Sequence, residues 1–134
     1  MRSKIFIGMA LAISIPAIAT LAASDVVMPQ SEQRVVMNFD RPTMIVDAIV
    51  MGPVLIVHNE AKEQVGQPCT TIYRFDPAKG RKEEIVSFSC KMVEKPVVDK
   101  FTASCKLSAA IGLHVLTEYQ FPGDTRAHDV PSRW

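Results

Sequence analysis

Residues 69–90, CTTIYRFDPAKGRKEEIVSFSC, contain the clearest local pattern in the chain. Two runs rich in β-branched and aromatic residues, 69–75 and 84–90, enclose a polar segment that contains Asp-Pro and Gly. Strand-forming runs on either side of turn-forming residues predict an antiparallel β-hairpin. If Phe75 lies opposite Glu84, the apolar residues of both runs share one face, and Cys69 then lies opposite Cys90.

This hairpin register bears on the three cysteines of the chain. In an exported protein, three cysteines usually form one disulfide and leave one thiol. Opposed residues of an antiparallel pair have Cα atoms roughly 4.5–5.5 Å apart, which is within disulfide range. We therefore predict that Cys69 and Cys90 form a structural disulfide worth on the order of 3 kcal/mol. Cys105 shares a strand face with apolar residues, and we expect it to be a buried thiol.

Short β-type runs separated by proline and glycine recur on both sides of the hairpin. The further strands that we expect are residues 34–39, 44–51, 54–58, 97–107 and 113–121. Turns are expected at 40–42 and at Gly52-Pro53, a polar loop with room for one helical turn at 60–67, and an irregular tail from about residue 122. The pattern predicts an all-β fold, a small antiparallel sandwich or partly open barrel of six or seven short strands.

The first 23 of the 134 residues differ from the rest. A positively charged start, an apolar run and a small-residue end follow one another, which is the order of a secretory signal peptide. Cleavage is allowed after Ala19, Ala23 or Ser24, and we expect residues 24–134 to form a single exported β domain. An uncleaved membrane anchor is the alternative, because residues 5–23 are just long enough to span a bilayer. We expect export from a bacterial cytoplasm to the periplasm or the medium, with no membrane attachment after cleavage.

The charge balance narrows the classes of partner. The chain carries 15 basic and 14 acidic residues, and two of the basic residues lie in the leader, which leaves 13 against 14. A net charge of about −1 gives no electrostatic reason to bind nucleic acid. Our leading hypothesis is a non-enzymatic binding module whose partner is a protein, an envelope component or a small ligand.

Two further functions remain open. A metal site for Zn²⁺ or Cu²⁺ could be assembled in space from side chains far apart in the sequence, with a solvated polar tail as the alternative. Its candidate ligands are His58, Asp124, His128 and Asp129, with a cysteine as a further candidate.

The chain lacks the common hydrolase, phosphate-binding, Cys-x-x-Cys and haem-attachment motifs, so we predict neither catalytic residues nor a cofactor. An exported enzyme whose site forms only in three dimensions stays possible, with Asp47, His58 or Cys105 as its actors.

Overall fold

A computed structural model describes residues 32–134; the leader predicted for residues 1–23 and its cleavage sites lie outside the described residues. Strands dominate this part of the chain, which confirms the all-β prediction. The elements are β1 Glu32–Ile45, β2 Ala48–Asn59, α1 Glu60–Gln64, β3 Thr70–Asp76, β4 Gly80–Phe88, β5 Lys91–Glu94, β6 Thr102–Ser108, β7 Leu113–Gln120 and β8 Arg126–Asp129. The described part contains one helix, α1, whose five residues are too few to cross a bilayer.

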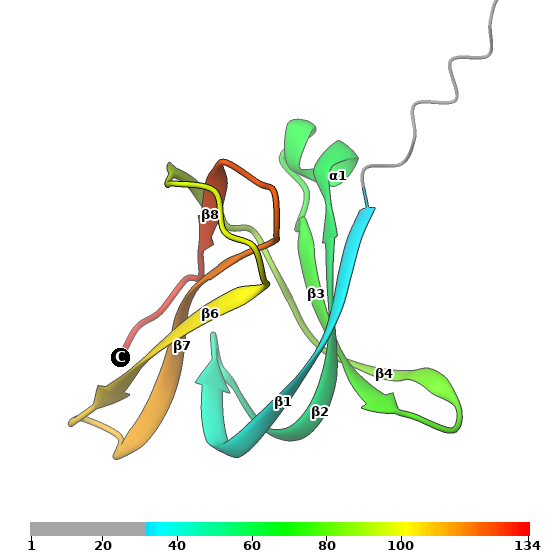
Figure 1. Cartoon of the computed structure of the whole chain (residues 1–134). Coiled ribbons are helices and arrows are strands. Elements are labelled where there is room, and N and C mark those ends of the chain that lie inside the picture. The colour runs from blue at the N-terminus through cyan, green and yellow to red at the C-terminus, as the bar shows by residue number, and fades with distance from the viewer. Residues whose placement is uncertain (1–31) are drawn as a thin grey trace, which may run out of the picture.

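The strands form a single eight-stranded sheet that curls into an open half-barrel (Figure 1). Its order is β4-β3-β2-β1-β7-β8-β5, and β6 pairs with β7. The pairs are antiparallel except for a short parallel contact between β1 and β7, where Thr43 lies opposite His114. Of the two predicted alternatives, the partly open barrel is the one that the structure shows.

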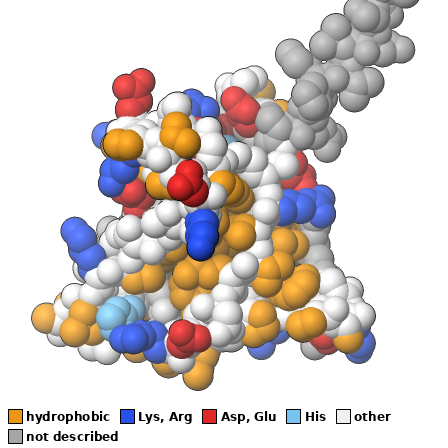
Figure 2. All heavy atoms as spheres, viewed as in Figure 1, with side chains coloured by type: hydrophobic (Ala, Val, Ile, Leu, Met, Phe, Trp, Pro, Cys, Tyr) orange, Lys and Arg blue, Asp and Glu red, His pale blue; other side chains and the backbone are white. Residues whose placement is uncertain are grey.

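The core lies on the concave side of this sheet. Val35, Met37 and Phe39 face it from β1, as their alternation predicted. Phe39 packs into a buried cluster that includes Ile56, Ile72 and Tyr119 from other strands. Figure 2 shows apolar side chains in the middle of the viewed face, between the regions of β6 and β1 in Figure 1. The curled sheet thus covers its apolar face only in part.

Two predicted chain breaks are wrong. The turn expected at 40–42 is instead a bulge in a continuous β1, where the register shifts between Phe39 and Thr43. A bulge leaves a residue unpaired, so it accommodates Pro42, which has no N–H to donate. Gly52-Pro53 does not divide the next strand either, because Gly52 adopts φ +85° and lets β2 continue. The actual turn lies at Val46-Asp47, between β1 and β2.

Gly52 therefore allows a local test of the continuous strand. We expect Gly52→Ala to lower the free energy of unfolding by about 1 kcal/mol, because a Cβ is unfavourable at positive φ. Apart from Gly52 and its two neighbours in the chain, no heavy atom lies within 4 Å of the position that a Cβ would occupy, so the loss reflects the backbone conformation. Urea denaturation of both proteins measures it, and an unchanged midpoint would contradict the assigned conformation.

The C-terminal residues and the second hairpin also differ from the prediction. The tail expected to be irregular contains β8, which pairs with both β5 and β7. Sequence alternation missed β5 and β8 because each has four residues, too few for a period to show. Cys105 is exposed, not buried, because the register of β6 and β7 shifts between Ser104 and Cys105. A shift of one residue moves side chains to the other face.

Candidate functional site

Two buried histidines meet where the ends of β2 and β8 approach each other. His58 is the penultimate residue of β2, and His128 lies on β8 opposite Tyr119 of β7. Their ring centroids are 4.2 Å apart, and the two residues are 2% and 0% exposed. Buried histidines need partners for both ring nitrogens, so two of them in contact indicate an organised polar site.

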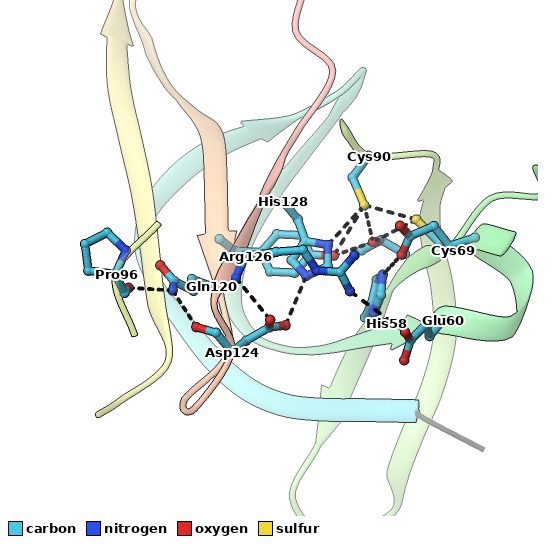
Figure 3. Close-up of polar contacts among 12 residues, drawn as sticks. His58, Glu60, Cys69, Cys90, Pro96, Gln120, Asp124, Arg126 and His128 are labelled. Atoms are coloured by element: carbon cyan, nitrogen blue, oxygen red, sulfur yellow. Dashed lines mark hydrogen bonds and ion pairs between the residues drawn. The ribbon is translucent and has the colours of Figure 1, made fainter. Parts of the chain in front are cut away.

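Cys69 and Cys90 lie against these histidines (Figure 3). The two Sγ atoms are 3.0 Å apart, and Cys90 Sγ lies 3.3 Å from His128 Nδ1. A ring nitrogen of His58 and the two sulfurs all lie within 4.8 Å of one another. The structure thus gathers two thiols and two imidazoles from β2, β8 and the open end of the β3–β4 hairpin.

The predicted disulfide is not present, since both residues are free thiols whose sulfurs lie beyond covalent bonding distance. The predicted register is also wrong by one residue at this end, because Thr70 pairs with Phe88. Near the turn the difference is three residues, because Phe75 pairs with Arg81, and two register shifts, after Ile72 and after Arg74, reduce it to one. The hairpin still brings Cys69 and Cys90 into contact, although they do not form a directly opposed pair.

Hydrogen bonds indicate which histidine nitrogens are free to bind a ligand. His58 Nε2 lies 3.1 Å from Glu63 Oε2, and because a carboxylate only accepts, Nε2 carries the proton and donates this hydrogen bond. The other nitrogen, Nδ1, is buried and has no hydrogen-bond partner among the described residues. A buried polar atom without a partner is costly unless a ligand occupies its lone pair. His58 Nδ1 is therefore the nitrogen available for coordination.

His128 has a related arrangement. Its Nδ1 faces Cys90, and its Nε2 is 3.9 Å from Asp124 Oδ2, too long for a hydrogen bond. Both histidines thus have a carboxylate near Nε2, which leaves Nδ1 as the nitrogen without a carboxylate neighbour. Metal-binding histidines commonly donate that outer N–H to a carboxylate, which fixes the tautomer and orients the ring.

Local structure positions these two carboxylates. Asn59 caps α1 by accepting a hydrogen bond from the Lys62 N–H, and the short helix presents Glu63 to His58. Gln120, which is buried, donates to the backbone carbonyls of Pro96 and Asp124. Asp124 Oδ1 in turn accepts the Arg126 N–H at 3.1 Å, which fixes the turn before β8.

Burial controls the protonation of the cluster. It lowers the pKa of His58, although the nearby Glu63 carboxylate opposes this change. It also lowers the pKa of His128 to about 4, and the neighbouring His58 contributes to that lowering. It also raises the pKa of the Cys90 thiol to about 12, with the adjacent Cys69 adding to the rise. At neutral pH the site therefore offers neutral imidazoles and a protonated Cys90 thiol, and a bound cation would have to displace that proton.

An aromatic support lies behind the cluster. The Tyr119 ring stacks on His128 with centroids 4.7 Å apart and planes 5° from parallel, and it also contacts Phe101 and Phe121. The Tyr119 hydroxyl is hydrogen-bonded to Thr70 Oγ1, next to Cys69 in the chain. Tyr119 thereby connects both sides of the site and fixes the plane of the His128 ring.

A polar cavity of about 330 Å³ leads to His58 from the surface. Glu60, Asp124 and Arg126 are among the residues that line it. Arg126 Nη2 lies 3.8 Å from Glu60 Oε1, and both side chains are partly exposed. His58 and the carboxylates of Glu60 and Asp124 thus share the wall of one cavity that is open to solvent.

The four metal ligands proposed from sequence separate into two groups. His58 and His128 are in contact, and Asp124 lies beside His128. Asp129 instead lines a different cavity, with Lys95 and Glu118, because adjacent residues of β8 point to opposite faces. A cysteine was also a candidate ligand from sequence, but Cys69 and Cys90 were assigned to a disulfide, so sequence reasoning did not place this pair beside the histidines.

The residues considered for an enzyme do not form one site. Asp47 is exposed in the β1–β2 turn. Cys105 lines a cavity of about 310 Å³ with Arg41 and His114. Arg41 Nη1 donates to His114 Nε2 at 3.0 Å, so that nitrogen is already engaged as an acceptor. This arrangement gives Cys105 no histidine base of the kind that a nucleophilic cysteine uses.

Comparisons with protein-family models, with curated proteins and with solved structures found no match. The geometry of the cluster is therefore the basis on which we infer function.

Proposed function

We propose that this protein is a metal-binding module whose ligand is a thiophilic cation, Zn²⁺ or Cu⁺, held by Cys69, Cys90, His58 and His128. Two observations carry the proposal: a His58 ring nitrogen and two sulfurs lie within 4.8 Å of one another, and the buried His58 Nδ1 has no hydrogen-bond partner among the described residues. Two thiolates and two imidazoles are a common tetrahedral ligand set for Zn²⁺, and thiolates also favour Cu⁺.

The observed distances are compatible with such a site. Tetrahedral Zn²⁺ with bonds of about 2.3 Å to sulfur places its two sulfurs about 3.8 Å apart. The sulfurs lie 3.0 Å apart in the structure, so they must move apart by less than about 1 Å to bind the ion. Cys90 lies in the two-residue connection between β4, which ends at Phe88, and β5, which begins at Lys91, so no strand pairing of its own opposes a shift of this size.

The surroundings also favour a cation. Glu63 and Asp124 lie beside the outer nitrogens of the two histidines, and Glu60 lines the cavity that leads to His58. Carboxylates at these positions stabilise the positive charge of a bound ion and raise the basicity of the imidazoles. The site would be closed by four protein ligands, which is typical of structural or storage sites and not of catalytic ones.

This proposal gives the predicted binding module a ligand class. Export to the periplasm or the medium, inferred from the leader, remains part of the proposal, because supply of Zn²⁺ or Cu⁺ and the redox state of thiols both depend on the compartment. Binding of a protein or envelope component has no comparable cluster of unpartnered groups in its favour among the described residues.

Metal binding is tested with protein purified with reduced thiols. We expect one Zn²⁺ or Cu⁺ per chain by elemental analysis, and a higher melting temperature on metal addition, because the ligand stabilises the folded state. Glu63→Ala is expected to weaken binding by about 10–100-fold, since it removes the acceptor that orients His58.

Cys90→Ser and Cys105→Ser form a matched pair of variants for a metal titration. The first removes a proposed ligand and is expected to weaken binding by about 100-fold, whereas the second alters an exposed cysteine elsewhere and leaves binding unchanged. Competition with a chromophoric chelator measures both affinities. Equal affinities in the two variants, or no metal uptake by the unmodified protein, would overturn the proposal.

A further inference from the structure

We propose that Cys69 and Cys90 are also a reversible redox pair, and that their oxidation to a disulfide by a small-molecule disulfide releases the metal. This inference rests on the proposed metal site and adds a regulation to it. It starts from the sulfur-to-sulfur distance of 3.0 Å. That distance lies between the about 2.05 Å of a disulfide and the about 3.8 Å of a tetrahedral zinc pair.

The two states of the sulfurs exclude each other. A movement of about 1 Å toward each other forms the covalent bond, and a slightly smaller movement apart admits the cation. In the disulfide both thiolate ligands are lost, which leaves two neutral imidazoles as the only proposed ligands. Thiolates provide much of the affinity for a thiophilic cation, so the oxidised site should bind Zn²⁺ weakly.

The position of the pair allows a small oxidant to reach it. Cys90 is half-buried, whereas Cys69 is only 2% exposed. Cys90 is therefore the residue that an external disulfide meets first, and Cys69 is placed to resolve the adduct. Thr70 Oγ1 lies 3.6 Å from Cys90 Sγ and 3.8 Å from Cys69 Sγ, so both sulfurs share a polar neighbour.

The exchange takes place in two steps. Cys90 first loses the proton that burial favours, and its thiolate then attacks one sulfur of oxidised glutathione, which forms a mixed disulfide and releases one glutathione thiolate. Cys69 then attacks Cys90 Sγ, which forms the Cys69–Cys90 bond and releases the second glutathione. The protons of the two protein thiols end on the two glutathione molecules, and two electrons pass from the protein to the glutathione disulfide.

The experiment uses the full chain with Cys105→Ser, which removes the exposed third thiol from the chemistry. Reduced, metal-free protein is equilibrated with oxidised glutathione, and its mass and Zn²⁺ affinity are measured before and after. We expect a mass loss of about 2 Da for an internal disulfide and an affinity for Zn²⁺ lower by about 100-fold or more. Dithiothreitol should restore binding.

A second variant, Cys69→Ser with Cys105→Ser, tests the order of the steps. It should retain one glutathione on Cys90, because the resolving thiol is absent. Persistence of a glutathione adduct when Cys69 is present, or unchanged Zn²⁺ affinity after disulfide formation, would overturn the redox inference and leave the metal site intact. Failure of the reduced protein to bind Zn²⁺ would overturn the proposed function and the release with it, and the mass change would then report a structural disulfide only.

Discussion

Replacing Tyr119 by alanine is expected to lower the free energy of unfolding by about 3–5 kcal/mol, the range found for large aromatic side chains removed from a core. Tyr119 is 1% exposed and contacts His128, Phe101 and Phe121 through its ring. Small domains are stable by only about 5–15 kcal/mol, so this substitution removes a large part of the total. Urea denaturation with fluorescence and circular dichroism measures the change.

Tyr119→Phe is the matched control, because it keeps the ring and removes only the hydroxyl that is hydrogen-bonded to Thr70. We expect a loss of about 1 kcal/mol for the phenylalanine variant, as for a single buried hydrogen bond. The ring, not the hydroxyl, would then account for most of the stabilisation. Losses of equal size in the two variants would contradict this assignment and place the main contribution in the bond to Thr70.

The sequence was sufficient to predict the fold class and the central hairpin, and the reason is physical. Alternation along β1 placed Val35, Met37 and Phe39 on one face, and the Asp76 to Gly80 connection lies between β3 and β4. Such patterns are local. The bulges that shift the register after Ile72 and after Phe39 are set by packing against neighbouring strands, which no single strand encodes.

The candidate site could be predicted only in part. His58 and His128 were chosen for their chemistry, but 70 positions separate them, and only the pairing of β8 with β7 brings His128 beside the end of β2. β8 has four residues and no detectable period, so its pairing with β7 could not be predicted from the sequence. The cysteines were expected to be close to each other, and their contact with the histidines depends on the same missed strand.

Acidification of the metal-free protein is expected to destabilise it between pH 6.5 and about 4. Burial holds the pKa of His128 at about 4 in the folded state, against about 6.5 in an unfolded chain. The unfolded state therefore binds more protons in this interval, so stability is complete above pH 6.5 and falls as the pH decreases toward 4. The slope is about 1.4 kcal/mol per pH unit for one histidine, which gives a total of about 3 kcal/mol.

Charged groups that face the two histidines either add to the lowering of their pKa values or oppose it. Burial lowers the pKa of His58 in the same direction, whereas Glu63, Glu60 and Asp124 oppose it. Arg126 and the neighbouring His58 add to the lowering at His128. Below about pH 4 carboxylates also titrate, so the measurement is made above that value.

His128→Phe tests the assignment, because it keeps a planar ring against Tyr119 and removes the ionisable nitrogens. Urea denaturation in the presence of a chelator, at intervals from pH 7.5 to 4.5, should give a shallower slope for this variant, lower by about 1.4 kcal/mol per pH unit. His114→Gln, in the wall of the cavity that Cys105 also lines, serves as the control and should keep the full slope. Equal slopes for the unmodified protein and His128→Phe would show that His128 is not held neutral by burial, and that protons do not compete with a cation for its nitrogens.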